Sequence, residues 1–383
     1  MTNIYYLNKF LYTMLGFGLL IKGGYIAIVG ILVLIYSLLK LREYKFMYIF
    51  FLLLLSWQII GYVKFNSYTS SNIDFFREIG FLDFKYLAIL GIALFSITNF
   101  LLFVNGVEFI EKKLIKLSWY SVLIMLFIPM IENGPTAILN LYGYAHLENS
   151  IMTSYSFDTI AGEIGIILTL SILSFKNKIK FQKQLILCFI VSIILGRRSL
   201  SLLPIIFFII YSSVYKERIN FYKLFKSLLL VTIILAVLFH FSSFIDLDSR
   251  NSISRILKSF VSNEDDARVG LFEDFNERYA GGYFGMDYLP HEFNREGNSS
   301  FHNVIFDTLW YSGIVGLILY YIPYLILILR SVIIKDYKVL AIILVITAYQ
   351  ITGASPFGGF QQLCIIFPIL MHKLKLYKWD IRK

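Results

Sequence analysis

Charged side chains are scarce in this sequence. Aspartate, glutamate, lysine and arginine make up 16% of its 383 residues, whereas soluble globular domains carry about 25%. Hydrophobic residues reach 58%, and runs without any charge, such as 185–195 and 228–239, recur along the chain. A membrane-spanning helix needs about 20 mainly apolar residues. The composition therefore excludes an ordinary soluble fold and predicts an all-α, polytopic integral membrane protein.

The sequence also lacks the motifs of several enzyme classes. Its two cysteines, Cys188 and Cys364, lie inside apolar runs and offer neither a zinc-binding spacing nor a disulfide framework. No glycine-rich phosphate loop and no nucleophile elbow is present. These absences argue against ATP hydrolysis, and we expect no metal ion and no cofactor. Any reaction must therefore use a substrate that arrives already activated.

Apolar runs bounded by charged residues predict about twelve membrane-spanning helices in one transmembrane domain, 1–383. The runs are 4–21, 25–39, 46–63, 86–104, 117–131, 159–175, 184–195, 199–215, 227–244, 304–329, 339–353 and 360–371. The first run has no small-residue cleavage site, so we expect a membrane helix there and not a removable signal peptide. The run 304–329 is long, which predicts that it begins outside the hydrocarbon core.

Lysine and arginine are unequally divided between the two sides of this layout. One side holds both termini and the loops 40–45, 105–116, 176–183, 216–226 and 330–338. It carries 23 of the 35 basic residues when Lys9, in the first run, is counted with the N-terminus, and the opposite side carries 12. Because basic residues in short loops mark the cytoplasmic side, we place both termini in the cytoplasm. The net charge of +10 is thereby interpreted as an orientation signal, and we expect no nucleic-acid partner.

Residues 245–303 form the one long loop of this layout, on the outer side. The first half of the loop carries the apolar spacing of a helical face: Ile253, Ile256, Leu257, Phe260 and Val261. Phe272, Phe275 and Tyr279 indicate a second helix. Two amphipathic helices between membrane spans are expected to lie at the interface and cover the bundle. An outer loop without any chemistry is the alternative interpretation.

The densest group of polar residues ends this loop, in the sequence Ser299-Ser300-Phe301-His302-Asn303. His302 falls where the loop enters a predicted helix, and Ser300 is a candidate N-cap. The N–H groups of a helix N-terminus favour an anionic ligand such as phosphate. A histidine at that place can act as a general base near neutral pH. The alternative is a polar interfacial residue that only caps the helix.

A second group, Gly196-Arg197-Arg198-Ser199, joins two apolar runs with almost no loop. An arginine at the bilayer centre costs at least ~2.5 kcal/mol, so such residues usually face a cavity or pathway. The planar guanidinium can bind phosphate or pyrophosphate through two parallel hydrogen bonds. The alternative is a turn whose arginines extend into the lipid headgroups.

Other charged residues are weaker candidates. Among Arg255, Arg268, Arg278 and Arg295 of the outer loop, Arg268 is the best placed, because it precedes the second amphipathic helix. The acidic residues of the loop have no spacing typical of a cation-binding motif. Glu163 lies inside an apolar run and is a candidate intramembrane carboxylate, with a position at the outer interface as the alternative.

Three short patterns occur in order along the second half of the chain. They are Gly196-Arg197-Arg198-Ser199 before an apolar helix, 267–272 ahead of Gly281-Gly282-Tyr283-Phe284-Gly285, and His302-Asn303 followed by Asp307, Gly313 and Gly316. With one large outer loop late in about twelve helices, they resemble the O-antigen polymerase and ligase superfamily, which includes Wzy-type polysaccharide polymerases. Arg198 takes the position of the arginine in the family's Gly-Ser-Arg, and Arg197 is extra. The family's usual proline is absent from 281–285.

The resemblance implies a glycosyltransferase that needs no metal ion or nucleotide. It would join oligosaccharide repeats carried on undecaprenyl pyrophosphate, at the outer face of the bacterial cytoplasmic membrane. Arg198 and Arg268 are expected to bind the pyrophosphate, and His302 to orient or deprotonate the acceptor hydroxyl. Further candidates for binding pyrophosphate or sugar are Arg197, Asn303, Arg278 and Arg255. The expected partners are the lipid-linked oligosaccharide, membrane lipid and a regulator of chain length.

Two other functions stay open. A ligase of the same superfamily would transfer finished polymer to lipid A core or to protein, with the same leaving group and fold. A lipid-linked oligosaccharide flippase also has about twelve helices. A flippase is expected to carry its charges in a central cavity and to lack an outer loop like 245–303.

Overall fold

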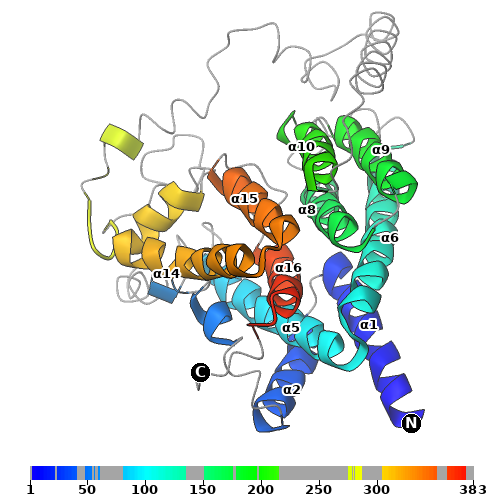
Figure 1. The fold of residues 1–383 in the computed structure, drawn as a ribbon, viewed down its shortest axis with the longest axis horizontal. Helices are drawn as coiled ribbons and strands as arrows, with labels where there is room; N and C mark the ends of the chain where they lie inside the picture. Colours follow the sequence, from blue (N-terminus) through cyan, green and yellow to red (C-terminus); the bar gives the residue numbers. More distant parts are fainter. Residues whose placement is uncertain are drawn as a thin grey trace, which may run out of the picture. The chain divides into compact units, whose positions relative to one another are not determined.

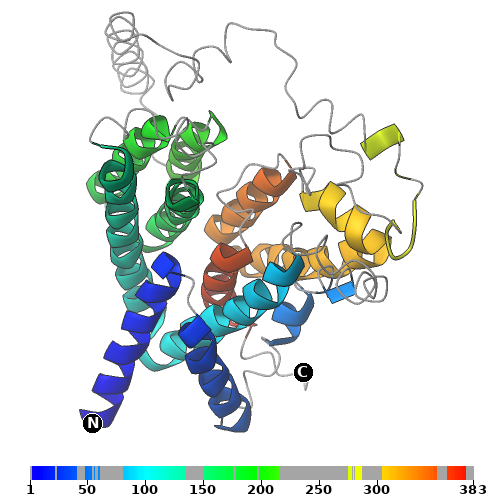
Figure 2. The same cartoon turned by 180° about the vertical axis from the view of Figure 1, so that it is seen from behind.

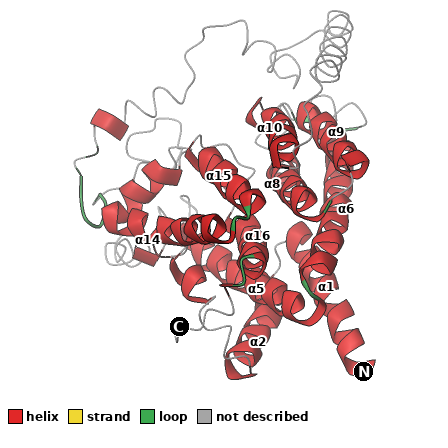
Figure 3. Cartoon of the chain, viewed as in Figure 1, coloured by secondary structure: helices red, strands yellow, loops and turns green. Residues whose placement is uncertain are grey.

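The structure is a computed structural model that describes residues 2–21, 24–40, 48–53, 56, 59–60, 81–134, 151–175, 178–195, 198–214, 275–277, 279, 281–286, 304–351 and 360–376. Within these ranges the chain forms helices and short connections, without a strand (Figure 3). The prediction of an all-α protein is confirmed for this part of the chain.

Ten helices have defined bounds among the described residues. They are α1 (Thr2–Ile21), α2 (Gly24–Lys40), α5 (Phe81–Asn105), α6 (Val107–Asn133), α8 (Ile151–Ser174), α9 (Lys178–Ile194), α10 (Arg198–Val214), α14 (Val304–Ile334), α15 (Tyr337–Ile351) and α16 (Phe360–Lys373). Each covers one of the predicted apolar runs, and residues 48–53 of the run 46–63 are also helical. The predicted span 227–244 and the amphipathic segment 253–261 lie outside the described residues.

The chain divides into two compact units, residues 1–113 with 265–383 and residues 114–264. In the first unit, α5 packs against α1, α2 and α16. The two opposite views in Figures 1 and 2 both show α16 beside α5. A helix that is apolar on every side is stable only when it is surrounded, and Leu94, Phe95 and Ile97 of α5 are fully buried. Gly30 of α2 brings the two backbones close, because a Cβ there would lie 2.2 Å from the Ala93 Cα.

α14 and α15 form an antiparallel pair in the same unit. The connection is a tight turn in which Lys335 adopts a φ of 59°, and Asp336 caps α15 by accepting the Val339 N–H at 3.2 Å. A carboxylate at this place also interacts favourably with the positive, N-terminal end of the helix dipole. α15 follows α14 directly, so Gln350 of α15 can reach the tyrosines of α14.

The second unit packs α8, α9 and α10 against one another. The ring of Phe181 in α9 stacks on Tyr211 of α10, with the ring centroids 4.2 Å apart. The indole N–H of Trp119, in the second half of α6, donates to the Gln184 side chain of α9. These contacts join α6, α9 and α10 within residues 114–264.

The predicted loop 105–116 is wrong for most of its length. α5 ends at Asn105, Gly106 adopts a φ of 78°, and α6 begins at Val107. The charged residues Glu108, Glu111 and Lys112 ended the apolar run, but all are good helix formers and continue the helix backbone. Similarly, α8 begins at Ile151, eight residues before the predicted span.

Two described helices, α6 and α14, are long and apolar enough to cross a membrane. Shorter apolar stretches of 10–17 residues lie in α2, α5, α8, α10, α15 and α16. The length and composition of these two helices indicate association with a membrane.

Candidate functional site

α14 is broken near its outer predicted end. Gly313 has φ 64° and ψ −163°, a conformation outside the helical region, and the helix bends there (Figure 1). The regular hydrogen bond from the Ile314 N–H to the Trp310 carbonyl is lost at such a break. Buried backbone groups that lose a helical partner need another one.

The segment 281–286 supplies these partners. The Ile314 N–H donates to the Gly282 carbonyl at 3.3 Å, and the Val315 N–H donates to the Tyr283 carbonyl at 3.1 Å. In return, the Met286 N–H donates to the Trp310 carbonyl at 2.8 Å. We call the segment 281–286, held by these three bonds, the docked turn. It satisfies the backbone groups on both sides of the break.

Glycine is required where the two backbones meet. A Cβ on Gly313 would lie 2.4 Å from the Gly282 carbonyl oxygen and 2.4 Å from the Gly285 nitrogen. Gly285 has a φ of 85°, and a Cβ there would lie 2.4 Å from the Trp310 carbonyl oxygen. These contacts are to backbone atoms, which cannot rotate away as a side chain could. The docked turn therefore depends on the spacing of its glycines.

An aromatic cluster supports the docked turn from the side of the loop. Phe275 stacks on Phe306 at 4.3 Å and on Tyr279 at 4.7 Å between ring centroids, and Trp310 lies fully buried beside them. The Tyr279 N–H donates to the Phe275 carbonyl at 2.8 Å, as in a helical turn. Burial raises the pKa of the Tyr279 hydroxyl above its ordinary value. Phe275 and Tyr279, two of the three residues that indicated a second loop helix, thus pack on the first turns of α14.

Among the predicted site residues, only the backbone of Arg198 is described, as the first residue of α10. His302 and Asn303 immediately precede Val304, where α14 begins. They lie outside the described residues, as do Arg197, Arg255, Arg268 and Arg278. The structure therefore brings together the glycines of the second and third sequence patterns, but it does not place the histidine and the arginines around one site.

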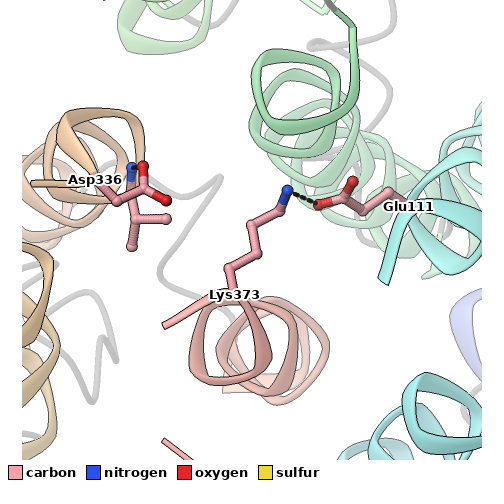
Figure 4. A network of polar contacts seen from close by, with 4 residues as sticks. Glu111, Asp336 and Lys373 are labelled. Carbon is pink, nitrogen blue, oxygen red and sulfur yellow. Dashed lines mark hydrogen bonds and ion pairs between the residues drawn. The ribbon is translucent and has the colours of Figure 1, made fainter. Parts of the chain in front are cut away.

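A second polar group lies at the opposite end of α14, near the C-terminus. The Lys373 ammonium of α16 lies 3.0 Å from the Glu111 carboxylate of α6, and Glu111 is fully buried (Figure 4). Asp336 lies apart from this ion pair in the same view. His372, which was not among the predicted site residues, is buried and forms a hydrogen bond with the Asn99 side chain at 2.9 Å. The Arg330 guanidinium donates to the Leu374 carbonyl at 3.3 Å.

α14 and α15 share a buried polar network that was not predicted from the sequence. The Gln350 amide donates to the hydroxyls of Tyr320, at 3.0 Å, and Tyr324, at 2.6 Å. The two hydroxyls lie 3.3 Å apart. A single glutamine in the apolar run 339–353 is the signal that could have predicted this network, because buried amides seek partners.

Metal ligands do not gather in the part of the chain that the structure describes, where no group of three His, Cys, Asp or Glu side chains lies together. Cys188 and Cys364 are buried free thiols. The described framework offers backbone groups, aromatic rings and paired charges. Comparison of the chain with protein-family models, with curated proteins and with solved structures finds no match.

Proposed function

We propose that this protein is a polytopic membrane glycosyltransferase that polymerises oligosaccharide repeats carried on undecaprenyl pyrophosphate. The reaction would take place at the outer face of the bacterial cytoplasmic membrane. The observation that carries the proposal is the docked turn: the glycine-rich turn of the second pattern seats on Gly313 of the third pattern. Two patterns about 30 residues apart, which suggested the family by their order alone, are in contact.

The orientation of the chain has support from contacts among predicted cytoplasmic segments. Lys373, in the C-terminal tail, pairs with Glu111 of the segment 105–116. Arg330, at the start of 330–338, bonds the tail at Leu374. Asn8, in the first half of the predicted span 4–21, donates to Asn105 of the segment 105–116 at 3.2 Å. Segments assigned to one side by counting basic residues are expected to meet in this way.

The break at Gly313 supports an outer boundary for the spanning part of α14. Residues 314–334 would extend about 31 Å at 1.5 Å per residue, close to the ~30 Å thickness of the hydrocarbon core. Residues 304–312 are then free to lie at the interface with the docked turn. Irregular backbone at membrane depth is tolerated where protein groups satisfy it, as the docked turn does here.

The chemistry joins an acceptor sugar to the growing chain. The acceptor hydroxyl oxygen would attack the anomeric carbon of the donor, and the bond from that carbon to the pyrophosphate oxygen would break. His302 would take the proton of the hydroxyl as a general base. Arg198 and Arg268 would stabilise the negative charge that develops on the leaving undecaprenyl pyrophosphate. Asn303, Arg197, Arg278 and Arg255 are the further candidates for binding substrate.

The decisive experiment uses purified full-length protein, a cognate lipid-linked repeat and mass analysis of the products. Wild-type protein should yield a ladder of longer lipid-linked chains. His302→Ala and Arg198→Ala should give no ladder at unchanged amounts of protein in the membrane. His291→Ala, another histidine of the outer loop, is the matched control and should polymerise normally.

Each other outcome assigns a different function. Transfer of polymer only when lipid A core or a protein acceptor is added would indicate a ligase. Movement of the lipid-linked repeat across vesicles without chain growth would indicate a transporter. A normal ladder from His302→Ala would remove that histidine from the site.

A further inference from the structure

The first half of α6 separates its charged side chains by helical face. This segment was predicted as a loop, but it is part of one continuous helix, so the helical repeat decides which residues share a face. Glu111 is fully buried and pairs with Lys373. Three basic residues of the same segment are instead exposed: Lys112, Lys113 and Lys116. The buried carboxylate has its counter-charge elsewhere, so these lysines are available to an external anion.

The exposed lysines share a face with exposed apolar side chains further along α6. Residues three or four positions apart lie on one face of a helix. From Lys113 and Lys116 this spacing continues through exposed residues: Tyr120, Leu123, Phe127 and Ile131. The face is therefore basic near the start of the helix and apolar over the rest. A lipid bilayer offers the same order, from charged headgroups to acyl chains.

Aromatic rings lie beside two of the lysines. The Lys113 ammonium lies 5.6 Å from the centre of the Phe109 ring, and the Lys116 ammonium lies 5.5 Å from the centre of the Tyr120 ring. Helical side chains tilt towards the N-terminus, so Lys113 extends back by one turn to reach Phe109. Tyrosine is enriched at the membrane–water interface, and lysine side chains near helix ends extend towards the headgroups. The pairs are thus typical of the headgroup region.

The length of α6 agrees with that depth. Its 27 residues extend about 40 Å at 1.5 Å per residue. A bilayer with both of its headgroup regions is about 40–45 Å thick. The first turns of α6 would therefore lie among the headgroups of one leaflet. Lys113 lies about 9 Å from the start of the helix, and its side chain extends back towards that start.

α9 repeats this pattern and is joined to α6. The Trp119 indole of α6 donates to Gln184 of α9. Lys180 and Lys183 of α9 are exposed, and exposed apolar residues follow Lys183 at helical spacing: Ile186 and Ile190. The range Lys178–Ile194 holds no acidic residue, and Glu108 is the exposed acidic residue in the first three turns of α6. We call Lys112, Lys113, Lys116, Lys180 and Lys183 the lysine face.

We propose that the lysine face binds the phosphate groups of anionic phospholipids in the cytoplasmic leaflet. The ammonium groups supply the charge, and the exposed apolar residues beyond them contact the acyl chains. Basic clusters at the cytoplasmic end of a membrane helix are attracted to the negative surface of that leaflet. The inference rests on the membrane location in the proposed function, but it uses no residue and no step assigned to sugar transfer.

The test is native mass spectrometry of the purified full-length protein in detergent. The protein is titrated with phosphatidylglycerol or with phosphatidylcholine of the same acyl chains. Wild-type protein should bind phosphatidylglycerol at least about fivefold more tightly, because one lysine near an anionic membrane surface contributes roughly 1 kcal/mol. Lys113→Gln combined with Lys116→Gln should weaken phosphatidylglycerol binding by at least the same factor and leave phosphatidylcholine binding unchanged.

Two further pairs of substitutions serve as controls. Lys335→Gln combined with Lys375→Gln removes the same charge from two exposed lysines outside the lysine face, and should bind like wild type. Lys113→Arg combined with Lys116→Arg keeps both charges and should bind phosphatidylglycerol at least as tightly as wild type. Gel filtration checks that each variant is folded. If the glutamine pair aggregates, Lys180→Gln combined with Lys183→Gln decides the question by the same measurement.

Several results would overturn the proposal. They are equal affinity of the wild type for both lipids, an unchanged preference in the glutamine pair, and an equal loss in the control pair. A dimer that the glutamine pair dissociates, without a lipid preference, would identify a second copy of this chain as the partner. A normal polymer ladder without lipid preference would overturn this inference alone. Lipid preference without a ladder would overturn only the polymerase activity.

Discussion

Gly313→Ala should release the docked turn from α14. The added Cβ would lie 2.4 Å from two backbone atoms of the turn, and the φ of 64° with ψ of −163° is unfavourable for any side chain. Backbone strain of this kind costs about 1–3 kcal/mol. The strain and the clash are both relieved when the docked turn separates from α14. α14 can then straighten, so that the Trp310 carbonyl accepts the Ile314 N–H as in a regular helix. The Met286 N–H loses its partner.

The size of the effect can be estimated from these terms. Only the strain in the docked state changes the docking equilibrium, because the three backbone hydrogen bonds are lost on release in wild type as well. A strain of about 1–3 kcal/mol should therefore raise the population of the released turn about 5-fold to 150-fold. Cleavage by a protease follows that population when docking is fast relative to cleavage.

Limited digestion by chymotrypsin provides the measurement. Tyr283 and Phe284 are 77% and 57% exposed but are held on a rigid turn, and a protease needs a locally unfolded stretch of chain. Mass analysis should show cleavage after these residues at least about five times faster in Gly313→Ala than in wild type. Gly106→Ala is the matched control, because Gly106 has a φ of 78° but open space around its Cβ position. Equal cleavage in all three proteins would refute the reasoning.

Three further changes test other parts of the fold by thermal unfolding in detergent. Lys373→Met removes the counter-charge of buried Glu111 and should cost about 3–5 kcal/mol, most of which Glu111→Leu should restore in the double variant; no restoration contradicts this. Gly30→Val would press a side chain onto Ala93 and should cost about 1–3 kcal/mol or more, so an unchanged unfolding temperature argues against the close α2–α5 contact. Gln350→Leu deprives two buried tyrosine hydroxyls of α14 of their donor and should cost about 1–3 kcal/mol; wild-type stability would mean that the network contributes little.

The positions of the helices followed from the sequence because apolar runs and helices depend on the same side chains. The predicted run 199–215 and the observed α10, 198–214, differ by one residue at each end. Errors arose where charged residues end an apolar run but continue the helix backbone. Lys112 and Lys113 end an apolar run but not a helix, so the loop 105–116 was predicted where α6 already continues.

The break in α14 could not be predicted from its own sequence. The apolar pattern continues through Gly313, and a glycine inside an apolar helix is tolerated without a break. The partner that makes the break favourable is the docked turn, which lies about 30 residues earlier in the chain. Similarly, Glu163 is buried in the middle of α8 and not at its end, because that helix begins at Ile151 and continues through the polar residues before position 159.

The contacts of the last turn of α16 have a consequence for the synthesis of the protein. Residues 372–374 reach Asn99, Glu111 and Arg330, which belong to three other helices. These three residues follow their partners in the sequence, so Asn99, Glu111 and Arg330 are all synthesised first. A chain that stops short of them leaves a buried carboxylate without its lysine and an asparagine without its histidine. Nascent chains shorter than this would thus expose polar groups that only residues 372–374 cover, which marks such chains for degradation.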